Sequence, residues 1–142
     1  MEHAEYIYTE GMDKSELEER LRAGHHGVLG LADGTDSYAI PLSYHYDGDR
    51  LVIRISRHDG DSEKRQFIRT TETATFVCYT ASERDSWSIQ IRGPVQKLDD
   101  EIDETTLNEW FPPFRLFDEA VNDVAFELYE LQMDSVIGRQ TI

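Results

Sequence analysis

An alternating hairpin occupies the first half of the chain. Apolar residues recur at every second position from Tyr38 to Tyr46, and a second alternating run extends from Leu51 to Ser56. Residues that recur with a period of two lie on one face of a β-strand. Between the two runs, Asp47-Gly48-Asp49 is a typical hairpin turn. The chain must therefore bury one face of an antiparallel sheet.

Further strands and short helices are predicted on both sides of the hairpin. Strands are expected over 27–32, 74–80, 87–93 and 124–133, and helices over 14–23, 62–70 and 103–111. The first helix begins with a capping box formed by Asp13 and Glu16, and Gly24 is its expected C′ residue. Six strands joined mainly by hairpins predict a mainly β fold, an antiparallel barrel with short peripheral helices, because closure removes exposed edges. A β-sandwich is the alternative.

The chain is strongly acidic. It carries 29 Asp and Glu residues against 14 Lys and Arg residues, for a net charge of −15. The acids occur in every segment, which favours a halophilic, salt-adapted surface over an acidic mimic that binds a basic partner. No basic stripe is present, so nucleic-acid binding is not expected. A length of 142 residues is typical of a single domain, here residues 1–142.

Neither a signal peptide nor a membrane span is expected. The N-terminal residues lack a basic region followed by an apolar one, and no apolar run approaches the roughly 18 residues of a membrane helix. The single cysteine, Cys78, lies in the strand-like run TATFVCYT and is interpreted as a small buried hydrophobe. One cysteine is typical of a reducing compartment, so a cytoplasmic protein is expected.

A cationic loop follows the hairpin and runs into a helix. Residues 56–65 read SRHDGDSEKR. Lys64 and Arg65 lie near the start of the predicted helix, where backbone N–H groups and cations favour a phosphate. The alternative is that both cations pair with neighbouring acids on a solvated helix face.

Pro41 marks a second candidate position. A proline inside an alternating strand removes a ladder hydrogen-bond donor, which indicates an edge or an interruption of the sheet. The backbone groups around Leu42 and Ser43 are then available to a ligand. An ordinary edge strand without a ligand is the alternative.

The predicted strand over 87–93 is the third candidate. Ser88, Gln90 and Arg92 share one face, where polar side chains meet either solvent or a polar ligand, whereas Trp87 is typical of a core. The histidines have no metal-ligand spacing, and neither a nucleophile elbow nor a glycine-rich nucleotide fingerprint is present. No metal ligand and no catalytic residue is therefore assigned.

Taken in order, these segments are similar to a known family. The runs HHGVLGLADGTDSYAIPLSYHYDGDRLVIRI, TATFVCY and SIQIRGPVQKL, with the cationic loop between the first two, resemble the pyridoxamine 5′-phosphate oxidase-like FMN-binding split-barrel family. The similarity is greatest to the branch of nitroimidazole-resistance-type flavoproteins and uncharacterised archaeal proteins, and it covers residues 5–98. The fold that it implies is a six-stranded antiparallel split β-barrel.

The resemblance also implies a homodimer with FMN at the subunit interface. The flavin ring would lie beside Ala39, Ile40, Pro41, Leu42 and Ser43. The ribityl chain and phosphate would be held by Ser56, Arg57, His58, Ser62, Lys64 and Arg65. The segment with Trp87, Ser88 and Gln90 would approach the flavin from the same chain or from its partner.

The function implied is that of an FMN-binding flavoprotein, most simply a flavin-dependent oxidoreductase with a small-molecule substrate or electron donor. The deazaflavin F420 and haem are alternative cofactors. Two other classes stay open: a non-catalytic flavin or haem carrier or redox sensor with the same fold, and an acidic β-barrel interaction module without a cofactor.

Two features depart from the family pattern. Three acids, Asp59, Asp61 and Glu63, lie in the expected phosphate loop and oppose a dianion unless they face solvent or salt screens them. Near the C-terminus only Gly138-Arg139 resembles the substrate-binding positions of the true pyridoxamine phosphate oxidases. Oxidation of pyridoxine vitamers is therefore not the expected activity.

Overall fold

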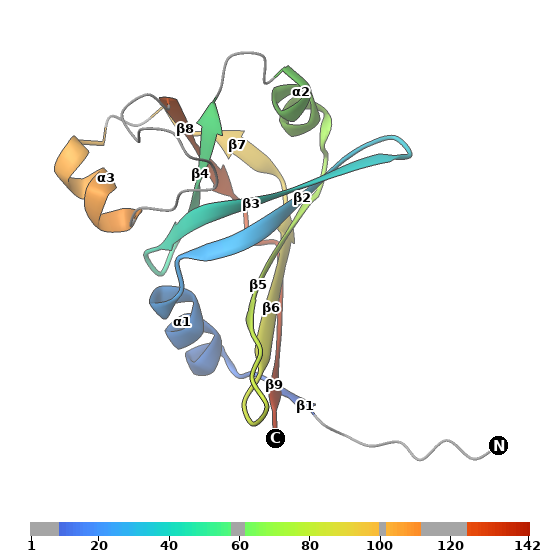
Figure 1. The fold of residues 1–142 in the computed structure, drawn as a ribbon, viewed down its shortest axis with the longest axis vertical. Coiled ribbons are helices and arrows are strands. Elements are labelled where there is room, and N and C mark those ends of the chain that lie inside the picture. The colour runs from blue at the N-terminus through green and yellow to red at the C-terminus, as the bar shows by residue number, and fades with distance from the viewer. Residues whose placement is uncertain (1–8, 58–61, 100–101, 112–124) are drawn as a thin grey trace.

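One antiparallel sheet dominates the computed structural model, which describes residues 9–57, 62–99, 102–111 and 125–142 (Figure 1). Its strands are β1 (Thr9–Gly11), β2 (His26–Asp33), β3 (Asp36–Tyr46), β4 (Leu51–Arg57), β5 (Ala74–Thr80), β6 (Trp87–Gly93), β7 (Val95–Lys97), β8 (Ala125–Leu131) and β9 (Ser135–Thr141). The helices of these ranges are α1 (Lys14–Ala23), α2 (Ser62–Thr70) and α3 (Glu104–Trp110). The strand order is β1-β9-β6-β5-β2-β3-β4-β8-β7, and every neighbouring pair is antiparallel.

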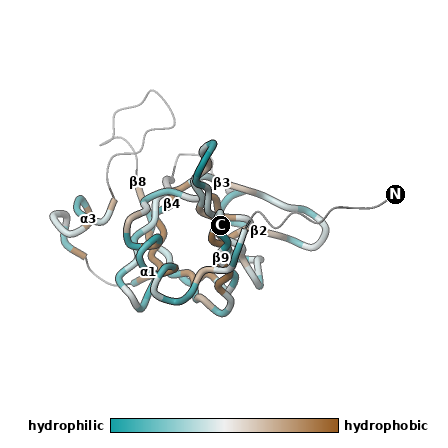
Figure 2. The backbone as a smooth tube through the Cα atoms, turned by 90° about the horizontal axis from the view of Figure 1, so that it is seen from below, coloured by the Kyte–Doolittle hydropathy of each residue, from teal (hydrophilic) through white to brown (hydrophobic). Residues whose placement is uncertain are grey.

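The predicted fold class, a mainly β antiparallel split barrel with short peripheral helices, is confirmed. The strands belong to one continuous sheet rather than to the two layers of a sandwich. Viewed along the barrel, the strands form a ring and α3 lies outside it (Figure 2). Helices α1 and α2 lie toward opposite ends of the barrel (Figure 1).

The predicted number of six strands is wrong, because the sheet of the described residues has nine. The last predicted strand, 124–133, corresponds to β8, after which the chain turns and continues as β9. Gly138 interrupts the apolar pattern of β9, but it is buried there, and a Cβ at this position would overlap Leu17 and Met12. The three-residue strands β1 and β7 are too short for a periodic signal.

The alternation of the hairpin is confirmed by burial. Leu42, Tyr44 and Tyr46 are buried, and Tyr38 and Ile40 pack against the same core. We call this face of the sheet the inner face and the opposite one the outer face. The core is completed by Leu21, Leu29, Leu31, Leu51, Ile53, Ile55, Phe67, Ile68, Ala74, Phe76, Cys78, Ile89, Ile91, Tyr129 and Leu131.

Strand β2 is less buried than its sequence predicts. The apolar run over 27–32 indicated a mostly buried strand, but only Leu29 and Leu31 are buried, and Val28 is 38% exposed. The reason is that no described element covers this part of the outer face. Cys78, by contrast, is buried as predicted, and burial raises the pKa of its thiol to about 11.

The start of α1 follows its sequence signals. Asp13 accepts a hydrogen bond from the Glu16 N–H at 2.8 Å, and the Glu16 carboxylate accepts one from the Asp13 N–H at 3.4 Å, which completes the predicted capping box.

The end of α1 differs from the expected left-handed C′ glycine, because Gly24 is extended, with φ −87° and ψ 162°. A Cβ at Gly24 would overlap the hydroxyl of the fully buried Tyr44, which donates a hydrogen bond to the Leu21 carbonyl at 3.0 Å. Close approach of the tyrosine therefore requires the glycine.

The hairpin of β2 and β3 extends beyond its neighbouring strands. The two strands pair over their full length, whereas β2 pairs with β5 only over Val28–Gly30 and β3 pairs with β4 only from Ser43 to Tyr46. The remainder is a two-stranded ribbon that projects from the barrel (Figure 1). Pro41 lies just before the β3–β4 pairing begins, where β3 has β2 on one side and no strand on the other, as its predicted edge position requires.

Within the described ranges, no helix combines the length and the apolar character that crossing a lipid bilayer requires.

Candidate functional site

A row of residues crosses the outer face of the sheet between Pro41 and Gln90. The antiparallel register pairs Pro41 with Val28, Val28 with Val77, and Val77 with Gln90. Strands are about 4.8 Å apart, so Pro41 and Gln90 are separated by about 14 Å along the sheet. The two valines between them, one 38% exposed and the other half-buried, form a small apolar surface. We call these four residues the outer row.

Next to the outer row, Ser43 presents an unusual hydroxyl. Ser43 is only 2% exposed, and its Oγ has no hydrogen-bond partner in the described part of the chain. A buried hydroxyl without a partner destabilises a fold by about 1–3 kcal/mol. Unsatisfied groups of this kind are a reason to look for a ligand or water that satisfies them.

Ser43 lies between a histidine and an arginine. It pairs with His26 on β2 and with Arg54 on β4. The Arg54 guanidinium lies 5.1 Å from the ring centroid of Phe111 and 4.2 Å from that of Phe126. Burial lowers the pKa of Arg54, and burial together with the charges of His25 and Arg54 lowers the pKa of His26. A partly buried group of hydrogen-bond donors therefore adjoins the apolar surface, in a chain that is otherwise acidic.

Helix α3 covers the outer face on the far side of Arg54. Its Trp110 ring stacks on His45 with centroids 4.4 Å apart and an interplanar angle of 5°. Burial is the main cause that lowers the pKa of His45. Phe111, which follows the helix, is buried. The α3 segment thus closes one side of the site around Ser43.

The start of α2 contributes cations at one end of the barrel. Arg65 donates to Glu127 at 2.5 Å in an ion pair, and the Tyr129 hydroxyl donates to the same carboxylate at 2.8 Å. Burial opposes the ionisation of Glu127, but these partners hold the pKa of its carboxyl below the ordinary value. Burial and the Glu127 bond raise the pKa of Tyr129 to about 12. Lys64, one residue earlier, is half-buried.

The predicted residues of β3 divide between its two faces. Ala39, Pro41 and Ser43 belong to the outer face, whereas Leu42 is buried in the core and Ile40 packs against it. Leu42 and Ile40 can therefore offer only their backbone to a ligand on the outer face.

The predicted phosphate residues are described only in part. His58, Asp59 and Asp61 lie outside the described residues. Ser56, Arg57 and Ser62 end β4 and begin α2, and their side chains also lie outside the description. Glu63 is exposed, so this acid of the loop faces solvent as a bound dianion would require.

Strand β6 separates its predicted residues. Ser88 and Gln90 are exposed on the outer face, where Ser88 pairs with Tyr79. Trp87 lies on the opposite face, half-buried, with the Arg20 guanidinium 5.3 Å from its ring centroid. The structure thus brings Ser43, Pro41 and Gln90 to one face but not Trp87.

Two residues of this face, His26 and Arg54, were not predicted from the sequence. The hairpin turn at 47–49 fixes the β3–β4 register, and counting back from that turn places Arg54 opposite Ser43. His26 has no comparable local signal, because its position depends on the pairing of β2 with β3.

Comparison with known proteins gives one family. The family model described as pyridoxamine 5′-phosphate oxidase matches residues 13–140. A search of curated proteins found no match.

Solved structures with the same fold cover nearly the whole chain. A FAD-binding protein from Mesorhizobium loti has a TM-score of 0.69 and 18% identity over 96% of this chain and 100% of its own. A protein assigned to 5-nitroimidazole antibiotic resistance from Bacteroides thetaiotaomicron has a TM-score of 0.66 and 16% identity over 99% and 96%. The FAD and haem binding protein from Mycobacterium smegmatis has a TM-score of 0.66 and 17% identity over 95% and 74%. At these identities the shared property is the fold.

Proposed function

This chain belongs to the pyridoxamine 5′-phosphate oxidase family, and we propose that it binds a flavin on the outer row beside Pro41. The observation that carries the proposal is the apolar surface of Val28 and Val77 next to the buried hydroxyl of Ser43, which has no hydrogen-bond partner among the described residues. A flavin ring system is flat and apolar over its faces and polar along one edge. Solved relatives of the same fold include FAD-binding and haem-binding proteins, which supports a cofactor here.

The outer row and its neighbours fit such a ring. The two valines offer a contact surface, and the Ser43 hydroxyl offers a hydrogen bond to the polar edge. The Arg54 guanidinium adds positive charge beside that edge, where partial burial strengthens electrostatic interactions, and His26 adds a neutral imidazole that can hydrogen-bond. A bound flavin would supply hydride or electron transfer, and this chain would bind the ring, orient it and exclude water.

FMN is the form we propose, because cations lie near the start of α2. Lys64 and Arg65 would hold the phosphate together with the backbone N–H groups of the helix start. Arg65 already binds Glu127, so its guanidinium would be shared between a carboxylate and the phosphate. Salt screens the acids of this chain, which would otherwise repel the phosphate, so FMN binding is expected to be weaker when salt is absent.

We also propose that the protein acts as a homodimer with the cofactor at the subunit interface. A ring beside Pro41 lies about three strand spacings from Gln90 of the same chain. The outer face also exposes large apolar side chains, with Tyr79 64% and Ile137 55% exposed. A second copy that covered this face would bury these side chains and bring its own Gln90 to the ring.

Reconstitution in high salt tests the cofactor proposal. We expect purified protein mixed with FMN to retain flavin absorbance after desalting and to melt at a higher temperature. FAD, F420 and haem are compared in parallel, and binding of haem alone would favour the carrier alternative. Retention of none of these cofactors would contradict the site. Reduction of bound flavin by NADH or NADPH in the presence of an acceptor then tests the oxidoreductase activity.

Ser43 gives a sharper test, because the proposal predicts opposite effects on stability and on binding. Ser43→Ala removes an unsatisfied buried hydroxyl, so the cofactor-free variant should be as stable as the parent or more stable. The same change should weaken FMN binding about five- to tenfold through the lost hydrogen bond. Ser37→Ala, at an exposed position of the same strand, is the matched control. Unchanged FMN affinity in Ser43→Ala would exclude this hydroxyl from the site.

A further inference from the structure

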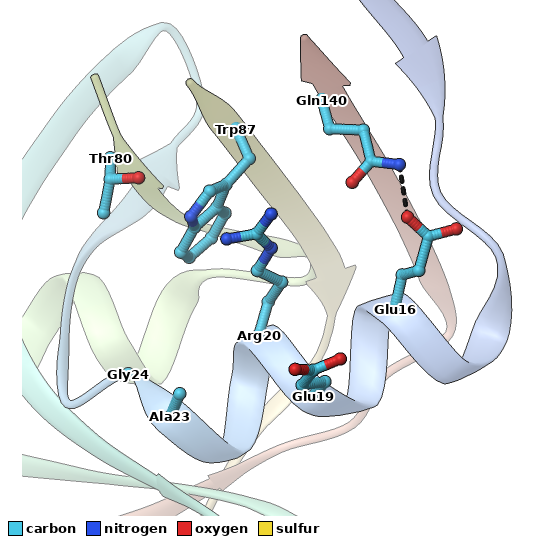
Figure 3. Close-up of a pocket in the computed structure, with 8 residues that line it drawn as sticks. All are labelled: Glu16, Glu19, Arg20, Ala23, Gly24, Thr80, Trp87 and Gln140. Atoms are coloured by element: carbon cyan, nitrogen blue, oxygen red, sulfur yellow. Dashed lines mark hydrogen bonds between the residues drawn. The ribbon is translucent and has the colours of Figure 1, made fainter. Parts of the chain in front are cut away.

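A cavity lies between α1 and the inner face of the sheet (Figure 3). Its volume is about 440 Å³, within the range of small-molecule sites. Three strands contribute one row to its floor, since Trp87 pairs with Thr80 on β5 and with Gln140 on β9. Helix α1 forms the opposite wall with Glu16, Glu19, Arg20 and Ala23, and Gly24 completes the lining.

This cavity is separate from the proposed flavin site. Trp87 faces α1, whereas Ser88 and Gln90 of the same strand face outward. Helices α1 and α2 also lie toward opposite ends of the barrel, and the phosphate site is proposed at the α2 end (Figure 1). Neither wall of the cavity contains a residue of the outer row.

Among the described residues, Arg20 is directed at this cavity without an anionic partner. Its guanidinium lies over the Trp87 ring, and within the described residues it forms no hydrogen bond or ion pair. The carboxylate one helical turn earlier, Glu16, is the usual partner for such an arginine. Here one oxygen of Glu16 accepts from the Gln140 side chain and the other from the Asp13 N–H (Figure 3).

The chemistry of the walls defines the ligand. A guanidinium with open donors binds a carboxylate through two parallel hydrogen bonds. The exposed carboxylate of Glu19, on the same wall, suits an ammonium group and would repel a simple anion. The indole of Trp87 offers a flat face, and Ala23 with Gly24 leaves room beside it.

We infer that this cavity binds a small zwitterion with a flat apolar group, such as a free aromatic amino acid. Its carboxylate binds Arg20, its ammonium group binds Glu19, and its ring packs on Trp87. The ligand carries no net charge, so the −15 charge of the chain does not repel it.

The test is a titration of the flavin-loaded or cofactor-free full chain with L-phenylalanine, followed by NMR. The chain has two tryptophans, and the proposal predicts a saturable shift of the Trp87 indole N–H signal. The Trp110 indole, which stacks on His45 outside the barrel, is the internal control and should not move. Trp110→Phe assigns the two signals. No saturable shift at Trp87 in the millimolar range would overturn the inference.

Ligand analogues and variants test the contacts separately. 3-Phenylpropionate lacks the ammonium group and phenethylamine lacks the carboxylate, and both should bind at least about tenfold more weakly than L-phenylalanine. Arg20→Gln should abolish the preference for L-phenylalanine over phenethylamine. If Arg20→Gln fails to fold, Arg20→Lys replaces it as the test variant: it keeps the charge but loses the two parallel donors, so the preference should be reduced. Arg22→Gln is the matched control, because Arg22 packs over Tyr46 away from the cavity. Equal binding of phenethylamine and L-phenylalanine, or an Arg20 variant with parental affinity, would overturn the assignment.

Discussion

The contact between Gly24 and Tyr44 predicts a strong coupling between two substitutions. Gly24→Ala places a methyl group on the Tyr44 hydroxyl, in a site where Tyr44 is fully buried and bonded to the Leu21 carbonyl at 3.0 Å. Overpacking of this kind destabilises a core by about 1–3 kcal/mol. If Tyr44 moves, the broken hydrogen bond adds about 1–3 kcal/mol. Gly24→Ala alone should therefore reduce the free energy of unfolding by about 2–6 kcal/mol.

Removal of the tyrosine hydroxyl should reverse this effect. Tyr44→Phe leaves the Leu21 carbonyl without its donor and should itself destabilise the protein by about 1–3 kcal/mol. In that background the alanine methyl no longer meets an oxygen, and the backbone of Gly24, at φ −87° and ψ 162°, is open to alanine. Alanine also restricts the unfolded chain, which stabilises by about 0.4–1 kcal/mol. Gly24→Ala should then be close to neutral.

A double-mutant cycle measures the coupling. Denaturant unfolding at constant high salt gives the free energy of unfolding of the parent, both single variants and the double variant. Gly11→Ala is the control, because a Cβ at Gly11 meets nothing within 4 Å. The structural reasoning requires a coupling energy of at least about 1.5 kcal/mol. Effects that add to within about 0.5 kcal/mol would refute the steric argument for Gly24.

Three further predictions concern other parts of the fold. The pKa of the Glu127 carboxyl is lowered in the folded protein, so its contribution to stability is present above the unfolded pKa of about 4.3 and is lost as pH falls through the folded pKa. Arg65→Gln removes the ion pair with Glu127 and should therefore move the midpoint of acid unfolding to higher pH. An unchanged midpoint would contradict the ion pair. Cys78, buried with its pKa raised to about 11, should react with a thiol reagent at pH 8 only after unfolding, and rapid modification of the native protein would show that the thiol is accessible. Gly138→Val should displace β9 and destabilise the protein by more than about 2 kcal/mol in calorimetry, whereas a neutral effect would mean that Leu17 and Met12 yield without loss of packing.

Local signals predicted most elements of this fold. The capping box at Asp13 placed the start of α1, and the alternation from Tyr38 to Tyr46 placed the inner face of β3. Three strands were not predicted, and each depends on a partner distant in the chain: β1 pairs with β9, β7 with β8, and β9 with β6. Pairing of this kind leaves little trace in the pattern of a three-residue segment.

Some residues of the candidate site were identified from the sequence, whereas His26, Arg54 and the arrangement of the site were not. Pro41 and Gln90 were identified from their own strands, yet their common row depends on the registers of β2, β5 and β6. A shift of one residue in any of these registers would exchange the two faces. Side chains alternate along β6, so Trp87 and Gln90 lie on opposite faces of the sheet. Trp87 therefore lines the cavity beside α1 and not the outer row.

The projecting β2–β3 ribbon has a mechanical consequence. Two strands that pair only with each other are marginally stable in water, and this ribbon gains its support from α2. The Thr71 hydroxyl, which follows α2, donates to the Ala32 carbonyl and accepts from the Ala32 N–H, both at 3.1 Å, and the Tyr38 ring stacks on Phe67 with centroids 5.2 Å apart. The ribbon is thus attached to the end of α2 by two hydrogen bonds and one ring contact. A displacement of α2 is therefore expected to be transmitted to the projecting end of the hairpin, which has no strand neighbours outside the ribbon.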